Sequence, residues 1–170
     1  MKIMWIGATC AMLIALCGCA IGAPRGYVPA IGLRAANYTE DYIHEYHLET
    51  VNGTDLRIGG AQVKQFSKGG ASVGDCCAAL PGVGQSLRVV WQTGGYNDPE
   101  STWTAHTVIA HIKGTTSDDP NSNTFLILRF FPNNQIEAEY VAQSLKSDSP
   151  LDPRVDLLFT GQRVMRQMGK

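Results

Sequence analysis

Apolar and polar residues alternate with a period of two in several short stretches of the chain, a pattern typical of strands with one buried face. In residues 135–140, isoleucine, alanine and tyrosine occupy the even positions, and glutamine and glutamate occupy the odd positions. Residues 87–92 alternate in the same way. Residues 43–51 are rich in β-branched and aromatic residues and end at Asn52-Gly53, a pair that favours a tight hairpin because both residues tolerate positive φ. These stretches predict strands.

Two further stretches predict strands, and one predicts a helix. Residues 107–112 are a short strand candidate, and residues 125–131 are apolar on both faces except for Arg129, as expected of a central strand. Pro132-Asn133-Asn134 then predicts a turn. The helix candidate covers residues 156–168 and is interrupted by a glycine. The whole pattern predicts a mainly β fold, a small antiparallel β-sandwich with little helix.

The N-terminal region has a different pattern. Residues 3–16 form an uncharged, almost wholly apolar run, which suits the core of a signal peptide and is shorter than the roughly 20 residues of a spanning helix. The run ends in Leu-Cys-Gly-Cys at residues 16–19, which resembles the lipobox of bacterial lipoproteins. The alternatives are an ordinary secretory cleavage site and a buried helix. We expect cleavage before Cys19 and lipidation of its sulfur.

This motif divides the chain into three parts. Residues 1–18 are expected to form a signal peptide, residues 19–36 a lipidated tether rich in Gly, Ala and Pro, and residues 37–170 a single β-rich domain. Ala20 beside the anchor is typical of lipoproteins that are sorted to the outer membrane. The expected location is the bacterial cell envelope, in the outer membrane and facing the periplasm.

The charges exclude one class of partner. The chain has 14 Lys and Arg residues against 15 Asp and Glu residues, a formal net charge of −1, and it has no basic run. Such a surface has no electrostatic attraction to nucleic acid. Membrane attachment is therefore expected through the lipid, in which each buried methylene contributes about 0.8 kcal/mol.

Only Cys76 and Cys77 remain as free cysteines after cleavage and lipidation at Cys19. The expected compartment is oxidising, but adjacent Cα atoms lie only about 3.8 Å apart, below the usual disulfide range. Two alternatives stay open, a vicinal disulfide and buried thiols. In either form we expect a structural role, and no zinc site because no second cysteine pair is present.

One motif suggests catalysis. Residues 70–74, Gly-Ala-Ser-Val-Gly, match the nucleophile elbow of serine hydrolases, and Asp98 followed by His106 or His111 completes the hydrolase order. An elbow requires a buried strand before the serine and a helix after it, whereas a polar, glycine-rich segment precedes Ser72. We therefore assign no catalytic residue, expect no enzymatic activity, and predict that Ser72 lies in a loop that enters a strand.

The histidines predict no cofactor site. His44 and His47 are three residues apart, and His106 and His111 are five residues apart. Odd separations on a strand place two side chains on opposite faces, so neither pair is expected to chelate a metal. The sequence contains no phosphate-binding glycine loop and no cofactor fingerprint. We expect neither a cofactor nor a metal.

Several fragments together resemble a family of bacterial lipoproteins that share a domain of unknown function. The fragments are Asn37-Tyr38-Thr39 before Ile43, Val51-Asn52-Gly53, Gly69-Gly70, Cys76-Cys77 with Leu80-Pro81, Val89-Val90-Trp91, and Phe130-Phe131-Pro132-Asn133-Asn134. The double cysteine followed by Leu-Pro is the most specific of them. The chain departs from the family after this point, where Gly82-Val83-Gly84 lacks the family's tryptophan. The resemblance extends from Asn37 to Asp156.

The resemblance implies a function. Members of the family accompany lipase effectors of type VI secretion, which implies an immunity protein that binds and blocks a cognate (phospho)lipase in the periplasm. We expect loops 93–102 and 114–123 to form part of the partner-binding surface. The alternatives are a housekeeping outer-membrane lipoprotein that binds an envelope partner or a small ligand, and a lipid hydrolase that uses Ser72.

Overall fold

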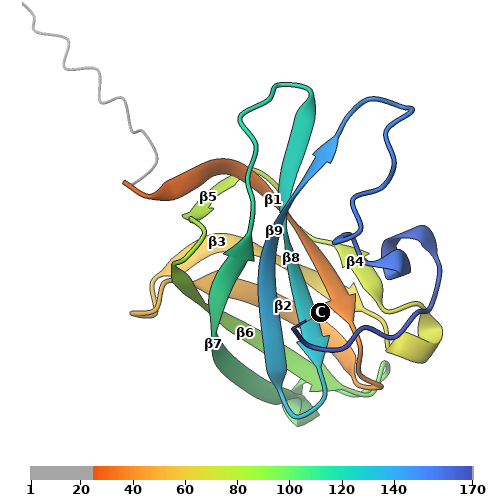
Figure 1. Ribbon diagram of the computed structural model, residues 1–170. Coiled ribbons are helices and arrows are strands. Elements are labelled where there is room, and N and C mark those ends of the chain that lie inside the picture. Colours follow the sequence, from red (N-terminus) through yellow and green to blue (C-terminus); the bar gives the residue numbers. More distant parts are fainter. Residues whose placement is uncertain (1–24, 170) are drawn as a thin grey trace, which may run out of the picture.

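The computed structural model describes residues 25–169, whose regular structure is almost entirely strand (Figure 1). The strands are β1 (Tyr27–Asn37), β2 (Tyr42–Glu49), β3 (Asp55–Val63), β4 (Ala71–Val73), β5 (Ala78–Pro81), β6 (Ser86–Gly94), β7 (Thr104–Gly114), β8 (Ser122–Phe131) and β9 (Gln135–Ser144). The short 3-10 helices are η1 (Phe66–Lys68), η2 (Glu100–Thr102) and η3 (Leu157–Thr160). The predicted mainly β class is confirmed, and none of the described helices is long and apolar enough to span a membrane.

The strands follow the order β3-β2-β6-β7-β9-β8-β1-β4 in one curled sheet, with β5 added beside β1. The pairs β1–β8 and β7–β9 are parallel, and the other pairs are antiparallel. The expected antiparallel sandwich is therefore not confirmed, because the described strands form a single mixed sheet. The β8–β9 hairpin folds so that β9, and not β8, lies beside β7, and β9 then runs in the direction of β7. A period of two in the sequence does not specify this order.

The sheet curls until β3 approaches β1, and the segment after β4 connects them. The N–H of Asp75 donates to the carbonyl oxygen of Gly59 on β3 at 2.7 Å, and the N–H of Gly59 donates to the Asp75 carboxylate at 3.0 Å. The carbonyl oxygen of Asp75 accepts from the N–H of Leu33 on β1 at 2.9 Å. Asp75 therefore provides hydrogen-bond partners for backbone groups of β1 and β3 that would otherwise be unpaired.

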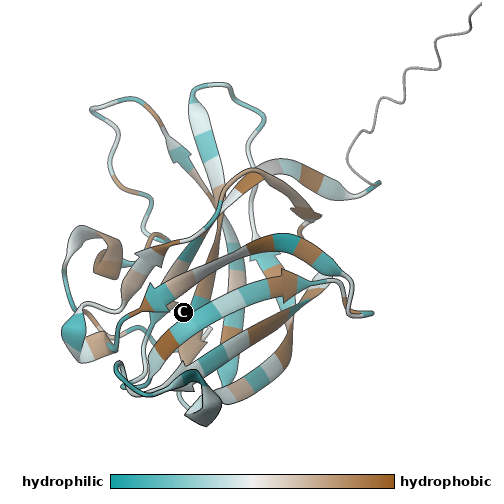
Figure 2. Ribbon diagram, turned by 180° about the vertical axis from the view of Figure 1, so that it is seen from behind, coloured by the Kyte–Doolittle hydropathy of each residue, from teal (hydrophilic) through white to brown (hydrophobic). Residues whose placement is uncertain are grey.

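The core lies inside the curl. Figure 2 shows hydrophobic and hydrophilic bands along the strands, as expected when alternate side chains face inward. The large side chains that are fully buried in this core include Leu33, Tyr46, Leu48, Leu87, Ile112, Leu126, Phe130 and Tyr140. Trp91 packs edge-to-face on Phe130, with ring centroids 5.7 Å apart.

The boundary predicted between tether and domain is wrong. Residues 19–36 were expected to form a tether, but β1 begins at Tyr27 and pairs with β8 from Gly32 onward. Ile31 and Leu33 are buried in the core. Pro29 lies near the start of β1, where a strand tolerates proline. The folded domain therefore begins ten residues earlier than composition suggested, because pairing with β8 and burial of Ile31 and Leu33 bring this segment into the sheet.

The prediction of a helix over residues 156–168 is also wrong. Only η3 is helical, and Gly161 follows it in the left-handed conformation, with φ of 81°. The C-terminal segment, η3 included, crosses the outer face of β8 and β9, with Val155 buried against Phe125, Ile127 and Val141, and Leu158 of η3 buried near Phe131. One face of these two strands therefore lies in the core, and the other face lies beneath the C-terminal segment.

Three buried tyrosines predict loss of stability at alkaline pH. Burial raises the pKa of Tyr38, Tyr46 and Tyr140 above the ordinary value of 10.0. Above about pH 10 the unfolded chain releases protons that the folded chain keeps, so the free energy of unfolding falls as pH rises. Urea unfolding between about pH 8 and 11 measures this slope, and Tyr140→Phe should reduce it by up to about 1.4 kcal/mol per pH unit. An unchanged slope in the variant would contradict the expectation.

Candidate functional site

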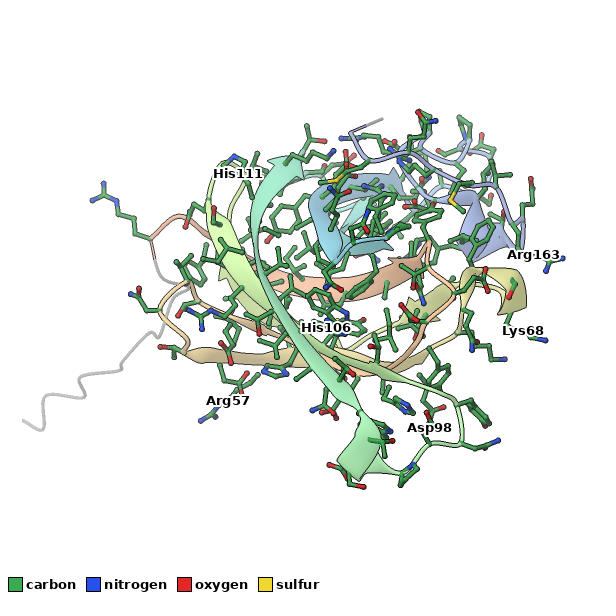
Figure 3. The ribbon with its side chains drawn as sticks, turned by 90° about the horizontal axis from the view of Figure 1, so that it is seen from below. Arg57, Lys68, Asp98, His106, His111 and Arg163 are labelled. Atoms are coloured by element: carbon green, nitrogen blue, oxygen red, sulfur yellow. A yellow bond between two sulfur atoms is a disulfide. The ribbon has the colours of Figure 1, made fainter. Side chains whose placement is uncertain are left out.

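The residues of the hypothetical hydrolase triad are not brought together. Ser72 lies on β4, which is followed by an extended segment and not by a helix, and its hydroxyl donates to the carbonyl oxygen of Ala61 at 3.3 Å. The Asp98 carboxylate accepts from the N–H of Gly95 at 2.7 Å. Figure 3 shows Asp98, His106 and His111 spread along β7 and the loop before it. The described geometry therefore provides no activated serine at this position.

The four histidines also have separate environments. His44 stacks on Trp103, and His47 lies 3.3 Å from the carboxylate of Glu49. Nε2 of His106 lies 2.7 Å from the hydroxyl of Thr93, and Nδ1 of His111 lies 3.4 Å from the hydroxyl of Ser86. Within residues 25–169, no three His, Cys, Asp or Glu side chains converge as metal ligands.

Cys76 and Cys77 form a vicinal disulfide, which resolves the two alternatives that the sequence left open. Both residues are exposed, so the pair does not form part of the core. The N–H of Cys77 donates to the carbonyl oxygen of Ile31 at 2.8 Å, and Cys77 has a φ of 80°. The disulfide therefore lies in the segment that connects β1 and β3. Cys19, the predicted lipidation site, lies outside the described residues.

A buried ionic cluster lies between the sheet and the C-terminal segment. Arg129 on β8 is 0% exposed, and its Nε donates to both carboxylate oxygens of Asp156 at 2.9 Å. Its Nη1 donates to Glu139 at 2.5 Å and lies 3.5 Å from Glu137. The hydroxyl of Tyr38 donates to Asp156 at 2.5 Å. Burial alone would lower the pKa of Arg129, but the hydrogen bonds and charges of Asp156 and Glu139 raise it overall.

This cluster attaches the C-terminal segment to the sheet. Asp156 belongs to that segment, and Nη2 of Arg129 also donates to the carbonyl oxygen of Arg154 at 2.6 Å. Alternation had placed Glu137 and Glu139 on the opposite face from the core, and both are buried there against Arg129. The half-exposed Lys113 contributes a second cation, 3.2 Å from Glu137. Because Arg129 and the three carboxylates are buried and paired with one another, we assign the cluster a structural role.

A group of aromatic side chains lies where β2 and β7 begin and β6 ends, and we call Tyr42, His44, Tyr96 and Trp103 the aromatic surface. Tyr96 is exposed, His44 and Trp103 are partly exposed, and Tyr42 is buried beneath Tyr96. The His44 and Trp103 rings stack with centroids 3.7 Å apart. Tyr96 is 66% exposed and packs edge-to-face on Tyr42, with centroids 5.2 Å apart. The indole N–H of Trp103 donates to the carbonyl oxygen of Asp98 at 3.0 Å, which orders the loop. Rigid, exposed aromatic side chains are typical of protein-binding surfaces.

A shallow hollow of about 410 Å³ opens beside the aromatic surface. Its lining residues are Tyr42, Lys64, Gln65, Lys68 and Tyr96. Lys64 and Lys68 are exposed, and neither forms an ion pair with another described residue. Arg163 lies at the same corner as Lys68 in Figure 3, and it donates to the carbonyl oxygen of Ser67 at 2.6 Å. The carboxylate of Glu40 also lies here and accepts from the hydroxyl of Ser67 at 2.6 Å. Three cations, Lys64, Lys68 and Arg163, therefore outnumber it, and we call these three residues the basic corner.

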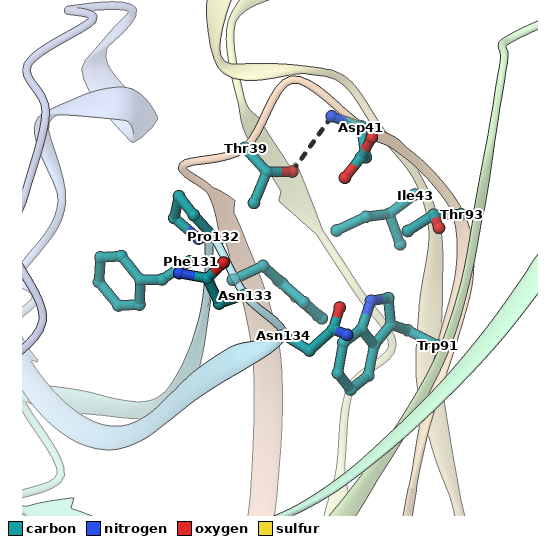
Figure 4. Close-up of a pocket in the computed structure, with 10 residues that line it drawn as sticks. Thr39, Asp41, Ile43, Trp91, Thr93, Phe131, Pro132, Asn133 and Asn134 are labelled. Carbon is teal, nitrogen blue, oxygen red and sulfur yellow. Dashed lines mark hydrogen bonds between the residues drawn. The ribbon is translucent and has the colours of Figure 1, made fainter.

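A second pocket at the same end of the sheet is too small for an organic ligand. It lies between the β8–β9 turn, the start of β2 and the end of β6, and Trp91, Thr93 and Asn134 are among its lining residues (Figure 4). Its volume is about 40 Å³, which is room for a water molecule or two. Ligand pockets for drug-sized molecules usually have about 300–1,000 Å³. Of these two places at the same end of the sheet, the aromatic surface with its larger hollow is therefore the better candidate for a functional site.

The sequence indicated part of this surface. Loop 93–102 was expected to contact a partner, and Tyr96 lies within it. Tyr42, Lys64 and Lys68 were missed because they converge only through the pairing of β2 with β3 and β6. The two aromatic residues at the ends of the loop from Tyr96 to Trp103 were the sequence feature that could have indicated this surface. Comparison of the chain with family models, curated proteins and solved structures finds no match.

Proposed function

We propose that the chain is an outer-membrane lipoprotein that binds and neutralises a cognate (phospho)lipase effector of type VI secretion in the periplasm. The observation that carries the proposal is the aromatic surface, in which Tyr96 is ordered and yet exposed. A tyrosine held by packing loses little conformational entropy when a partner covers it, and it adds a large apolar contact area. Inhibition then requires only that the bound protein block the lipase, without turnover.

The basic corner extends this surface. Lys64 and Lys68 would complement acidic groups of a partner and accelerate its association. The family resemblance and the lipobox at Cys19 support the choice of a lipase partner and a periplasmic location. Specific complexes of this kind bury about 1,200–2,000 Å² in total, so the aromatic surface and the basic corner would form only part of the interface.

Co-expression of the full chain with the lipase encoded beside its gene tests the proposal. We expect wild type to restore growth, and Tyr96→Ala to weaken binding by about 2 kcal/mol or more, because central tyrosines dominate binding energy. Leu145→Ala is the matched control, since Leu145 is equally exposed, at 63%, and lies beyond the other end of β9.

Two further variants test whether the protein is anchored through Cys19 and whether protection depends on Ser72. Cys19→Ser should leave the protein uncleaved or release it from the membrane fraction, and in either case abolish palmitate labelling. Ser72→Ala should protect as well as wild type, since Ser72 contacts only backbone carbonyl groups. If wild type gives no protection, or if a folded Ser72→Ala variant loses it, the proposed function fails.

A further inference from the structure

The N-terminal half of β7 has an unpaired edge. β7 pairs with β6 over Thr104–His111, but it pairs with β9 only over Ile112–Gly114. The N–H of Ile112 donates to the carbonyl oxygen of Gln85, beside β6, at 2.8 Å. Because the bonding residues alternate along an antiparallel ladder, even-numbered residues bond to β6. The N–H and C=O groups of Ala105, Thr107 and Ile109 and the N–H of His111 therefore point to the opposite edge, where the β7–β9 pairing of the described residues, which starts at Ile112, does not reach them.

This edge lacks the features that usually protect exposed strands. Protective features include lysine, proline, bulges and covering loops. Residues 104–112 contain no charged residue and no proline, and the register with β6 is continuous. The side chains of Ala105, Thr107 and His111 are exposed, and that of Ile109 is 54% exposed. The edge is therefore accessible and uncharged, and the residues at its centre are β-branched.

We propose that an extended segment of the partner effector adds to the edge of residues 105–111 as a further strand. This inference rests on the proposed function. It follows from the backbone geometry, because a row of alternating free N–H and C=O groups is complemented by another extended chain. The edge begins directly after Trp103, so it is continuous with the aromatic surface. The absence of charge over residues 104–112 and the exposure of Ile109 indicate an uncharged segment with an apolar residue opposite Ile109.

Thr107 provides a sharp test, because its N–H faces the open edge. Thr107→Pro removes that donor and places a ring where the added strand would lie, without removing a bond to β6. Thr107→Ala keeps the N–H and is the matched control. Ile109→Lys places a charge on the edge and leaves the backbone intact, with Leu145→Lys as its control. We expect Thr107→Pro and Ile109→Lys to weaken binding of the purified lipase at least about tenfold, and both controls to bind like wild type.

Titration calorimetry with the full chain in detergent measures these affinities, and thermal unfolding confirms that each variant is folded. If wild type binds but Thr107→Pro and Ile109→Lys bind equally well, the strand-addition inference is overturned and the proposed function stands. If wild type does not bind the lipase, both are overturned. If the edge variants instead abolish a dimer of this chain while lipase binding is unchanged, a second copy occupies the edge and the inference is again overturned.

Discussion

Replacement of Arg129 by methionine is expected to lower the free energy of unfolding by about 3–5 kcal/mol, the usual cost of removing one partner from a buried ion pair. Arg129 is fully buried, and its guanidinium group faces Asp156, Glu139 and Glu137. Methionine fills much of the same volume without charge, so the three carboxylates would remain in a site that excludes water. Denaturant unfolding followed by tryptophan fluorescence measures the change.

A partly exposed ion pair on the same fold provides the control. Arg88 lies 3.7 Å from Glu49, and both side chains contact solvent. Arg88→Met should cost no more than about 1 kcal/mol, because exposed pairs contribute little. The Arg129 variant should also become sensitive to proteolysis in residues 150–169, since Asp156 would lose its anchor. A loss in Arg129→Met no larger than that in Arg88→Met would show that the cluster does not hold the C-terminal segment.

The same cluster explains where the sequence was informative and where it was not. Alternation in residues 135–140 correctly predicted strand β9 and its inward face, because a period of two depends only on local geometry. It could not show that the opposite face is also covered. Glu137 and Glu139 are typical of a solvated face. Arg129 lies opposite Glu137 on β8, but their burial depends on the C-terminal segment with Asp156, which follows much later in the chain.

The predicted hairpin and turn are both present for the same local reason, although the loop of the hairpin, residues 50–54, is longer than a two-residue turn. Asn52-Gly53 lies between β2 and β3, with φ of 87° at Gly53. Asn133 and Asn134 both have positive φ in the turn between β8 and β9. By contrast, the aromatic surface and the open edge of β7 depend on strand order. Strand order results from long-range pairing, which a single sequence does not display.

Gly114 lies in the short pairing of β7 with β9 that follows the open edge, and Gly114→Ala is expected to destabilise the protein by about 2–5 kcal/mol, from backbone strain and steric overlap together. Gly114 has a φ of +94°, and a Cβ atom built there would lie 2.1 Å from the carbonyl oxygen of Tyr140 on β9. That contact is backbone, so it cannot be relieved by rotating a side chain. The parallel pairing of β7 with β9 would have to separate, and it includes only Ile112–Gly114.

Gly84→Ala isolates the contribution of strain. Gly84 has a similar φ of +84°, but nothing lies within 4 Å of the added Cβ. Its variant should therefore cost only about 1–2 kcal/mol, the price of a left-handed alanine. Hydrogen exchange should locate the difference, with faster exchange at Lys113 and Thr115 in Gly114→Ala and unchanged exchange along the β6–β7 ladder. If the two variants lose equal stability, β7 and β9 separate without cost at Gly114, and this short pairing does not fix the position of the open edge.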